Sequence, residues 1–301
     1  MPHTRSLARI QLVAAAVLFS TGGAAIKWVH FSGVQVAGLR SGIAGLAILA
    51  LVPAARRGWT WRVIPVGAAY AATLVLYVLA NKLTTSANTI FLQSTAPLYL
   101  LVLSPWLLRE RIRRGDITFM LAVGAGLALF FLGTQPPLVT APDPARGNLL
   151  AAFSGVTWAL TVCGLRWLSA HVPAPSAGKS EVTDASAIRA VVAGNFLAAA
   201  ACLPWGFPLG THSTGDWAIV LYLGIFQIGV AYLMVTAGLR LVPALEAAVL
   251  LLVEPALNPV WSWLVQGEVP AFWTLVGGAI ILGSTLIKTW FDARAATVKV
   301  S

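Results

Sequence analysis

The chain has 301 residues, of which 58% are hydrophobic and 10% are charged, and its mean hydropathy is +0.82. In a typical soluble domain about a quarter of all residues are charged, so this composition excludes a protein whose surface mostly faces water. The net charge of +10 lies in short basic clusters between apolar runs, which is typical of cytoplasmic loops and not of a nucleic-acid interface. The composition therefore predicts a multi-pass protein that has the lipid bilayer, and no nucleic acid, as a partner.

Ten continuous apolar runs follow one another along the chain. A helix needs about 20 apolar residues to cross the roughly 30 Å hydrocarbon layer, whereas a tilted transmembrane strand needs only about 10. The runs have the longer length, so we expect an all-α integral membrane fold with ten transmembrane helices. The predicted spans are residues 8–28, 33–52, 63–81, 87–107, 116–133, 148–167, 187–206, 217–238, 244–264 and 271–290.

The distribution of lysine and arginine sets the predicted orientation. If the N-terminus is cytoplasmic, 16 of the 20 basic residues fall in cytoplasmic loops and tails. Lys27, Lys82 and Arg146 fall outside, and Arg40 lies within a span. Because positive charge favours the inner side, we expect a protein of the cell inner membrane with both termini cytoplasmic.

Four features of the first half recur in the same order in the second half. A basic residue lies near the end of the first span, another lies inside the second span, and a third precedes the fourth span. A proline in the fourth span is followed by a glutamate, at the same spacing in both halves. The matched features are Lys27 with Arg166, Arg40 with Arg189, Lys82 with Arg240, and Pro97–Glu110 with Pro255–Glu268.

This repeat divides the chain into residues 1–140 and 141–301, with a flexible cytoplasmic connector predicted at 168–186. Each half has five spans, an odd number, so the second half must enter the membrane in the opposite orientation. Inverted repeats around a central cavity are typical of secondary transporters. A duplicated membrane scaffold without transport is the alternative.

The repeated proline and glutamate resemble a known family. Together with the Glu254–Pro255 pair and the Gly267–Glu268 turn before a glycine-rich last span, they are similar to EamA-type members of the drug/metabolite transporter superfamily. The resemblance covers nearly the whole chain and implies two five-helix halves. The stretch 77–97 is most similar to bacterial aromatic amino-acid exporters, which implies export of amino acids.

The first half departs from this pattern at its glutamate. Arg109 precedes Glu110 where the pattern has glycine before glutamate. We therefore interpret Glu110 as a structural loop charge.

The ninth predicted span provides the best candidate wall of a cavity. Glu254 and Asn258 are four residues apart and share one helix face. An ionisable side chain near the membrane centre is costly and functional by default. We expect Glu254 to bind a substrate ammonium group or a coupling proton. The alternative is a hydrogen-bonded glutamate that caps backbone groups freed by Pro255 and Pro259.

Polar and aromatic residues line other spans at helical spacing. The third span carries Tyr70, Tyr77 and Asn81, and the fourth is expected to place Asn88, Thr95 and Tyr99 on one face. Lipid satisfies neither hydroxyl nor amide groups, so these residues are expected to point inward, although hydrogen bonding between helices is an alternative. The predicted substrate-binding residues are Tyr77, Asn81, Gln93, Tyr99, Trp158, Gln227, Tyr232, Glu254 and Asn258.

Two pairs of repeat-equivalent residues have a less specific interpretation. Pro97 and Pro255 break the hydrogen-bond ladder near mid-span and are expected to form paired bends that take part in gating, with passive kinks as the alternative. Arg40 and Arg189 lie a turn or two inside their spans. Their pattern favours packing and orientation over binding of an anionic group.

Several function classes lack their sequence signatures. The chain has no Walker sequence and no HExxH motif, and its histidines lie at or beyond span ends. We therefore expect no enzyme activity, no cofactor and no metal. The sequence predicts a secondary transporter, monomeric or homodimeric, that exports amino acids, aromatic ones above all, or similar small amphipathic metabolites by alternating access. The alternatives are a drug or nucleoside-type exporter, a membrane scaffold or an enzyme subunit.

Overall fold

The computed structural model describes residues 2–107, 114–132, 136–171, 179–239, 241–242 and 244–298. In these ranges the regular structure is helical, apart from one isolated bridge between Leu138 and Ala141. The helices of the first half are α1 (Pro2–Ser20), α2 (Gly22–Trp28), α3 (Gly33–Leu51), the 3-10 turn η1 (Pro53–Ala55), α4 (Val63–Leu83), α5 (Ser86–Gln93), α6 (Ala96–Leu107) and α7 (Arg114–Leu132). Those of the second half are α8 (Pro144–His171), α9 (Lys179–Gly206), α10 (Thr214–Tyr222), the π-helical segment η2 (Leu223–Val230), α11 (Ala231–Leu239), α12 (Ala244–Leu251), α13 (Val253–Gln266) and α14 (Phe272–Val298).

Eight of the ten predicted spans are confirmed as helices long and apolar enough to cross a membrane. The first of them combines α1 and α2, and the seventh combines α10, η2 and α11. The eight are Ser6–Trp28, Gly33–Leu51, Val63–Leu83, Gly115–Leu132, Pro144–Leu168, Ala185–Gly206, Thr214–Gly238 and Phe272–Phe291.

The other two predicted spans, the fourth and the ninth, are each divided into two shorter helices. The first division falls between α5 and α6, where Pro97 is the second residue of α6. The second falls between α12 and α13, where Pro255 is the third residue of α13. The first N–H groups of a helix have no intrahelical partner. A proline there costs no hydrogen bond, so each of these prolines starts a new helix at a corresponding place in its half.

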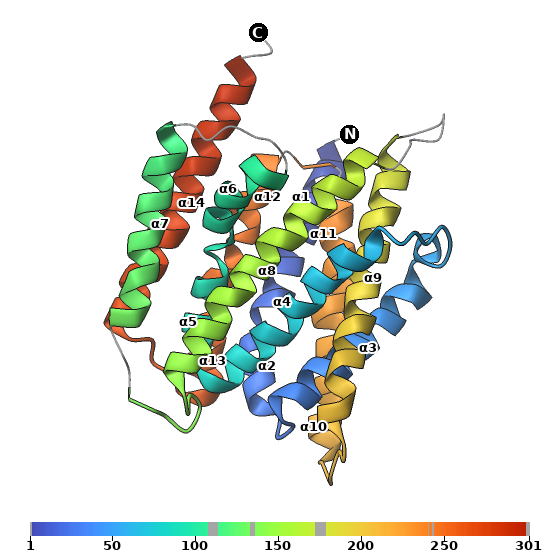
Figure 1. Cartoon of the computed structure of the whole chain (residues 1–301), viewed down its shortest axis with the longest axis vertical. Coiled ribbons are helices and arrows are strands. Elements are labelled where there is room, and N and C mark those ends of the chain that lie inside the picture. The colour runs from blue at the N-terminus through green and yellow to red at the C-terminus, as the bar shows by residue number, and fades with distance from the viewer. Residues whose placement is uncertain are drawn as a thin grey trace.

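The helices form one bundle in which elements of the two halves interleave. The helix α4 packs against α8 and α9, and α3 packs against α9 and η2. On the other side α1 packs against α11 and α13, while α7 and α14 lie together at one edge (Figure 1). The beginning of α1 and the end of α14 lie at the same end of the bundle (Figure 1), as an even number of membrane crossings requires.

The predicted connector at 168–186 is shorter than expected. The helix α8 continues to His171, and α9 begins at Lys179. The residues that break helices in this segment, two prolines and one glycine, all lie at 172–178, outside the described residues. The polar stretch that follows them lacks such residues and continues as helix.

Glycines bring some helices into backbone contact. A Cβ atom added to Gly194 of α9 would lie 2.7 Å from the carbonyl oxygen of Gly67 on α4, and one added to Gly277 of α14 would lie 2.8 Å from that of Gly126 on α7. Small residues of this kind allow close packing of helices in a membrane. The α4–α9 contact matters most here, because α4 carries the predicted site residues Tyr77 and Asn81.

We expect Gly194→Ala to lower the thermal stability of the protein, because its methyl group would force α4 and α9 apart. Gly283→Ala is the matched control. It also lies inside a helix, but its added Cβ would meet nothing within 4 Å. An alanine in such a position stabilises a helix by about 0.5–1 kcal/mol. The midpoint temperature of thermal unfolding, measured in detergent micelles, should therefore fall for Gly194→Ala and rise for Gly283→Ala. Equal shifts of the two midpoints would contradict the close α4–α9 contact.

Candidate functional site

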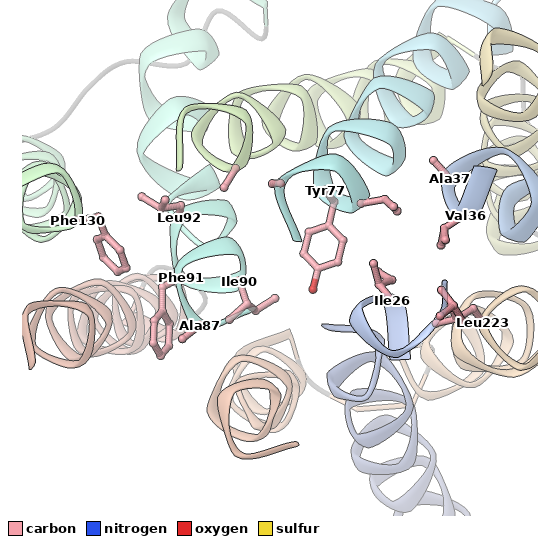
Figure 2. Close-up of a cluster of buried hydrophobic side chains, with 14 of the residues drawn as sticks. Ile26, Val36, Ala37, Tyr77, Ala87, Ile90, Phe91, Leu92, Phe130 and Leu223 are labelled. Atoms are coloured by element: carbon pink, nitrogen blue, oxygen red, sulfur yellow. The ribbon is translucent and has the colours of Figure 1, made fainter. Parts of the chain in front are cut away.

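Tyr77 and Asn258, predicted site residues from opposite halves of the chain, meet inside the bundle. The Nδ2 atom of Asn258 on α13 donates a hydrogen bond of 3.3 Å to the hydroxyl of Tyr77 on α4. Both side chains are buried. Figure 2 shows the Tyr77 ring extending from its helix, with the hydroxyl in the space between Ile90 and Ile26. The structure thus joins α4 to α13 at the point where α13 has just begun.

Hydrogen-bond acceptors are left without partners around this contact. Asn81, one turn after Tyr77, donates its Nδ2 hydrogen bond to the Tyr77 carbonyl at 3.3 Å. Its Oδ1 and the Oδ1 of Asn258 are buried and have no hydrogen-bond partner among the described residues. A Cβ on Gly23 of α2 would lie 2.7 Å from the Asn258 Oδ1, so glycine leaves room for the amide. Such acceptors are suited to a ligand with N–H or O–H donors, because an unsatisfied buried group costs about 1–3 kcal/mol.

Glu254 adds a carboxylate to the same face of α13. It lies in the first turn of the helix, four residues before Asn258, and the helix dipole stabilises a negative charge there. The side chain is half-buried and lies within electrostatic range of Tyr77. In the described part of the chain it forms no hydrogen bond or ion pair, so the backbone-capping role considered for it is not seen in this structure.

Aromatic residues lie on α4, α6 and α8, and α8 packs against the other two helices. The ring centroids of Tyr70 and Trp158 are 6.2 Å apart and tilted by 49°. The half-buried Tyr99 packs against α8, since a Cβ on Gly155 would lie 3.1 Å from its Cε2. These predicted residues therefore form an aromatic surface on the α4–α8 side.

Three other predicted residues lie at separate places. Gln227, in the π-helical segment η2, is buried, and its Nε2 donates to the Phe19 carbonyl at 3.4 Å, while its Oε1 has no hydrogen-bond partner among the described residues. Tyr232 is half-buried and packs against the hydrophobic cluster that contains Tyr70. Gln93 is half-buried at the end of α5, and no hydrogen bond links it to Tyr77 or Asn258.

The expectation that Asn88, Thr95 and Tyr99 share one helix face is wrong. The division between α5 and α6 places Asn88 on α5 and Tyr99 on α6. Asn88 instead donates from Nδ2 to Asn148 Oδ1 at 3.0 Å and accepts at Oδ1 from the Thr274 hydroxyl at 2.7 Å. It links α5 to α8 and α14, and none of its hydrogen bonds in the described part of the chain reaches Tyr77 or Asn258.

A buried ion pair between Lys27 and Glu268 was not predicted from the sequence. Their Nζ and Oε1 atoms are 2.8 Å apart, and both side chains are 3% exposed. Lys27 also donates to the carbonyls of Thr84 and Thr140, and the Ser86 N–H donates to Glu268 Oε2 at 3.0 Å. The pair ties the ends of α2, α4 and α13 together at the end of the bundle opposite the termini (Figure 1).

The sequence signal for this pair was present in two separate observations. Lys27 was one of the repeated basic residues, and Glu268 followed the repeated proline at the repeated spacing. Each was interpreted within its own half. Two expected partners of this repeat, Glu110 and Arg240, lie outside the described residues, and so does Arg109.

Comparison with known proteins gives consistent matches. The family model of the EamA-like transporter family matches residues 7–132 and again residues 145–290. An uncharacterized transporter of Archaeoglobus fulgidus is 26% identical over 215 residues, which is 71% of each chain. The uncharacterized transporter YetK of Bacillus subtilis is 27% identical over 68% of this chain and 60% of its own length. A protein crystal structure with 21% identity aligns over 96% of this chain and 99% of its own with a TM-score of 0.61, so the two share a fold.

We expect Lys27→Met to destabilise the protein strongly, because it leaves the buried Glu268 carboxylate without its counter-ion. Removal of one partner of a buried pair costs about 3–5 kcal/mol, whereas replacing both partners by apolar residues is often neutral. The double variant Lys27→Met/Glu268→Met should therefore recover most of the loss. Chemical denaturation in detergent micelles measures the free energy of unfolding of the single and the double variant.

The control for this experiment is the ion pair between Arg9 and Glu246, whose side chains are 54% and 34% exposed. An exposed pair contributes about 0–1 kcal/mol. Arg9→Met should therefore change the free energy of unfolding little. If Arg9→Met and Lys27→Met lowered the free energy of unfolding equally, the Lys27–Glu268 pair would contribute no more to stability than an exposed ion pair does.

Proposed function

The chain belongs to the EamA-like transporter family, and on that premise we propose that it is a secondary transporter that exports amino acids across the inner membrane by alternating access. Aromatic amino acids, or related small amphipathic metabolites, are the proposed substrate class. The relatives in Archaeoglobus fulgidus and Bacillus subtilis are described as transporters.

Glu254 is the observation that carries this proposal. A carboxylate within a predicted span is costly unless it faces a partner, water or a ligand, and this one has no protein partner among the described residues. Glu254 lies within electrostatic range of Tyr77, and the amide groups that contact Tyr77, those of Asn81 and Asn258, have oxygens without a hydrogen-bond partner among the described residues. A carboxylate and several acceptors suit a positively charged group with N–H donors, such as the ammonium group of an amino acid.

The aromatic surface supports a substrate with an apolar or aromatic side chain. Tyr70 shares α4 with Tyr77, and Tyr99 and Trp158 lie on α6 and α8, where α8 packs against both α4 and α6. Aromatic rings stack on one another or attract a cation above their faces, with gains of about 0.5–1.5 kcal/mol for a ring pair. An amphipathic metabolite satisfies both parts of this site, its charged end near Glu254 and its side chain near Trp158.

The arrangement of helices supports two inverted halves. Helices at equivalent positions in the two halves pack on each other, as α3 does on α9 and α7 on α14. Other contacts occur in corresponding pairs: α4 with α8 matches α11 with α1, and α4 with α9 matches η2 with α3. The divisions before Pro97 and Pro255 also correspond. Inverted repeats and discontinuous helices are features of alternating-access transporters.

The proposed topology follows from the positive-inside rule, with both termini in the cytoplasm. In this orientation the Lys27–Glu268 pair lies at the external end of the bundle. It holds α2, the α4–α5 connection and the α13–α14 connection together there. We propose that the structure represents a state closed toward the outside.

The experiment that tests this function is counterflow in proteoliposomes. Purified protein is reconstituted with a labelled panel of aromatic and aliphatic amino acids, nucleosides and cationic drugs, with and without a proton gradient. Counterflow of aromatic amino acids is the expected result. Counterflow of nucleosides or drugs alone would favour the alternative exporter, and no counterflow of any compound would overturn the transporter proposal.

We expect Glu254→Gln to abolish gradient-driven transport, because the amide removes the negative charge of the site. If Glu254 binds the substrate ammonium group, counterflow at zero gradient is lost as well. If it binds a coupling proton, counterflow remains and only the response to the gradient is lost. Glu246→Gln, which removes an acid of the preceding helix α12, is the control and should leave transport unchanged. Full gradient-driven transport by Glu254→Gln would contradict the proposed role.

A further inference from the structure

Arg40 on α3 is a buried cation with few partners. Its side chain is 2% exposed and is among the largest fully buried side chains of the described residues. A guanidinium group has five N–H donors. Here Nη2 donates one hydrogen bond of 3.3 Å to the Leu74 carbonyl, and Nε has no partner among the described residues. No carboxylate of the described residues pairs with it.

Such a group is expensive to keep inside a protein. Moving an ion out of water costs several kcal/mol even after the surroundings relax, and an anion at good geometry is needed to offset this cost. The single long hydrogen bond to the Leu74 carbonyl supplies only a weak part of this compensation. The guanidinium therefore lacks the anion that would stabilise it, and the rest of the described chain does not provide one.

The position of Arg40 connects it to the candidate site. Its hydrogen-bond acceptor, Leu74, is one turn before Tyr77 on α4, so the guanidinium lies against the face that carries the tyrosines. Val36 is one turn before Arg40 on α3 and shares its face. Val36 belongs to the same hydrophobic cluster as Tyr77, and Figure 2 shows it to the right of the Tyr77 ring.

Tyr77 consequently lies between groups of opposite charge. Arg40 approaches it from α3, and Asn258 and Glu254 approach it from α13. Both Arg40 and Glu254 are within electrostatic range of Tyr77. A buried cation and a carboxylate on two sides of one aromatic residue match the two charges of a zwitterion.

We propose that Arg40 binds the carboxylate of the substrate. This inference rests on the proposed function and narrows it to substrates that carry both an ammonium and a carboxylate group. The carboxylate replaces the Leu74 carbonyl as acceptor and engages the unpartnered Nε. Paired N–H donors of arginine match the two oxygens of a carboxylate.

Arg189 provides a matched control. It is the repeat-equivalent arginine, is 9% exposed, and also has an Nε for which the described residues provide no partner. Its Nη1 donates to the carbonyl of Gly58, in the loop between η1 and α4. Arg40 acts electrostatically on Tyr70 and Tyr77 of α4, and Arg189 is not among the groups that do so. Arg189 therefore has the same chemistry as Arg40 but does not adjoin the site.

The test compares two ligands that differ only in the carboxylate, L-phenylalanine and phenethylamine. Dissociation constants are measured by calorimetry on the purified full-length protein and on the variants Arg40→Gln, Arg40→Lys and Arg189→Gln. The wild type should bind phenylalanine about 10- to 100-fold more tightly than phenethylamine. Arg40→Gln should abolish this difference by weakening phenylalanine alone. Arg40→Lys should retain part of it, and Arg189→Gln all of it.

The outcomes separate this inference from the proposed function. If wild type binds neither these ligands nor other amino acids, the function fails and the inference fails with it. If wild type prefers phenylalanine and Arg40→Gln keeps that preference, only the inference is overturned. The same holds if Arg189→Gln removes the preference equally. If Arg40→Gln does not fold, Arg40→Lys still tests the inference. An unchanged preference of that variant for phenylalanine over phenethylamine would exclude a contact of two parallel hydrogen bonds between Arg40 and the carboxylate.

Discussion

Proline lacks a backbone N–H, and only the first turn of a helix accommodates it without the loss of a hydrogen bond. Pro255 lies in that first turn of α13, which begins at Val253, whereas Pro259 lies inside the same helix. A helix beginning there presents its partial positive charge to the Glu254 carboxylate. The same helix places Asn258 one turn later on the same face, within reach of Tyr77. The start of α13 beside Pro255 thus places Glu254 in the first turn and Asn258 one turn later.

The Lys27–Glu268 pair places a second constraint on the bundle, at the opposite end from the termini. Its atoms hold connections from both halves together. Removal of one partner leaves a charge in a dry environment, whereas separation of both partners into water restores the hydration of each ion. Opening this end therefore avoids the cost of leaving one buried charge unpaired. In a transporter that alternates between two states, such a contact is stable when closed and can be exchanged for water when open.

The sequence predicted the parts of this structure that depend on local patterns. Apolar run length located eight spans, and helical spacing singled out Tyr77 and Asn258. The common face expected for Asn88 and Tyr99 was wrong, because a helix face cannot continue across a division. The pairing of Lys27 with Glu268 was not predicted, because no spacing rule connects partners that lie near opposite ends of the sequence. Only the folded bundle brings them together.

The two halves differ where the candidate site lies. In the proposed repeat, the prolines and the helix contacts have counterparts in both halves, and these shared features suit the exchange between two states. When the two halves are aligned so that Pro97 matches Pro255, Tyr77 and the polar residues around it have apolar counterparts. The counterparts are Ala96 for Glu254, Leu100 for Asn258 and Val235 for Tyr77.

A substrate with distinct charged ends has no two-fold symmetry, so its recognition requires residues that the repeat does not duplicate. The arginines differ in surroundings and not in residue type, because the repeat retains both but only Arg40 lies against the tyrosines of α4.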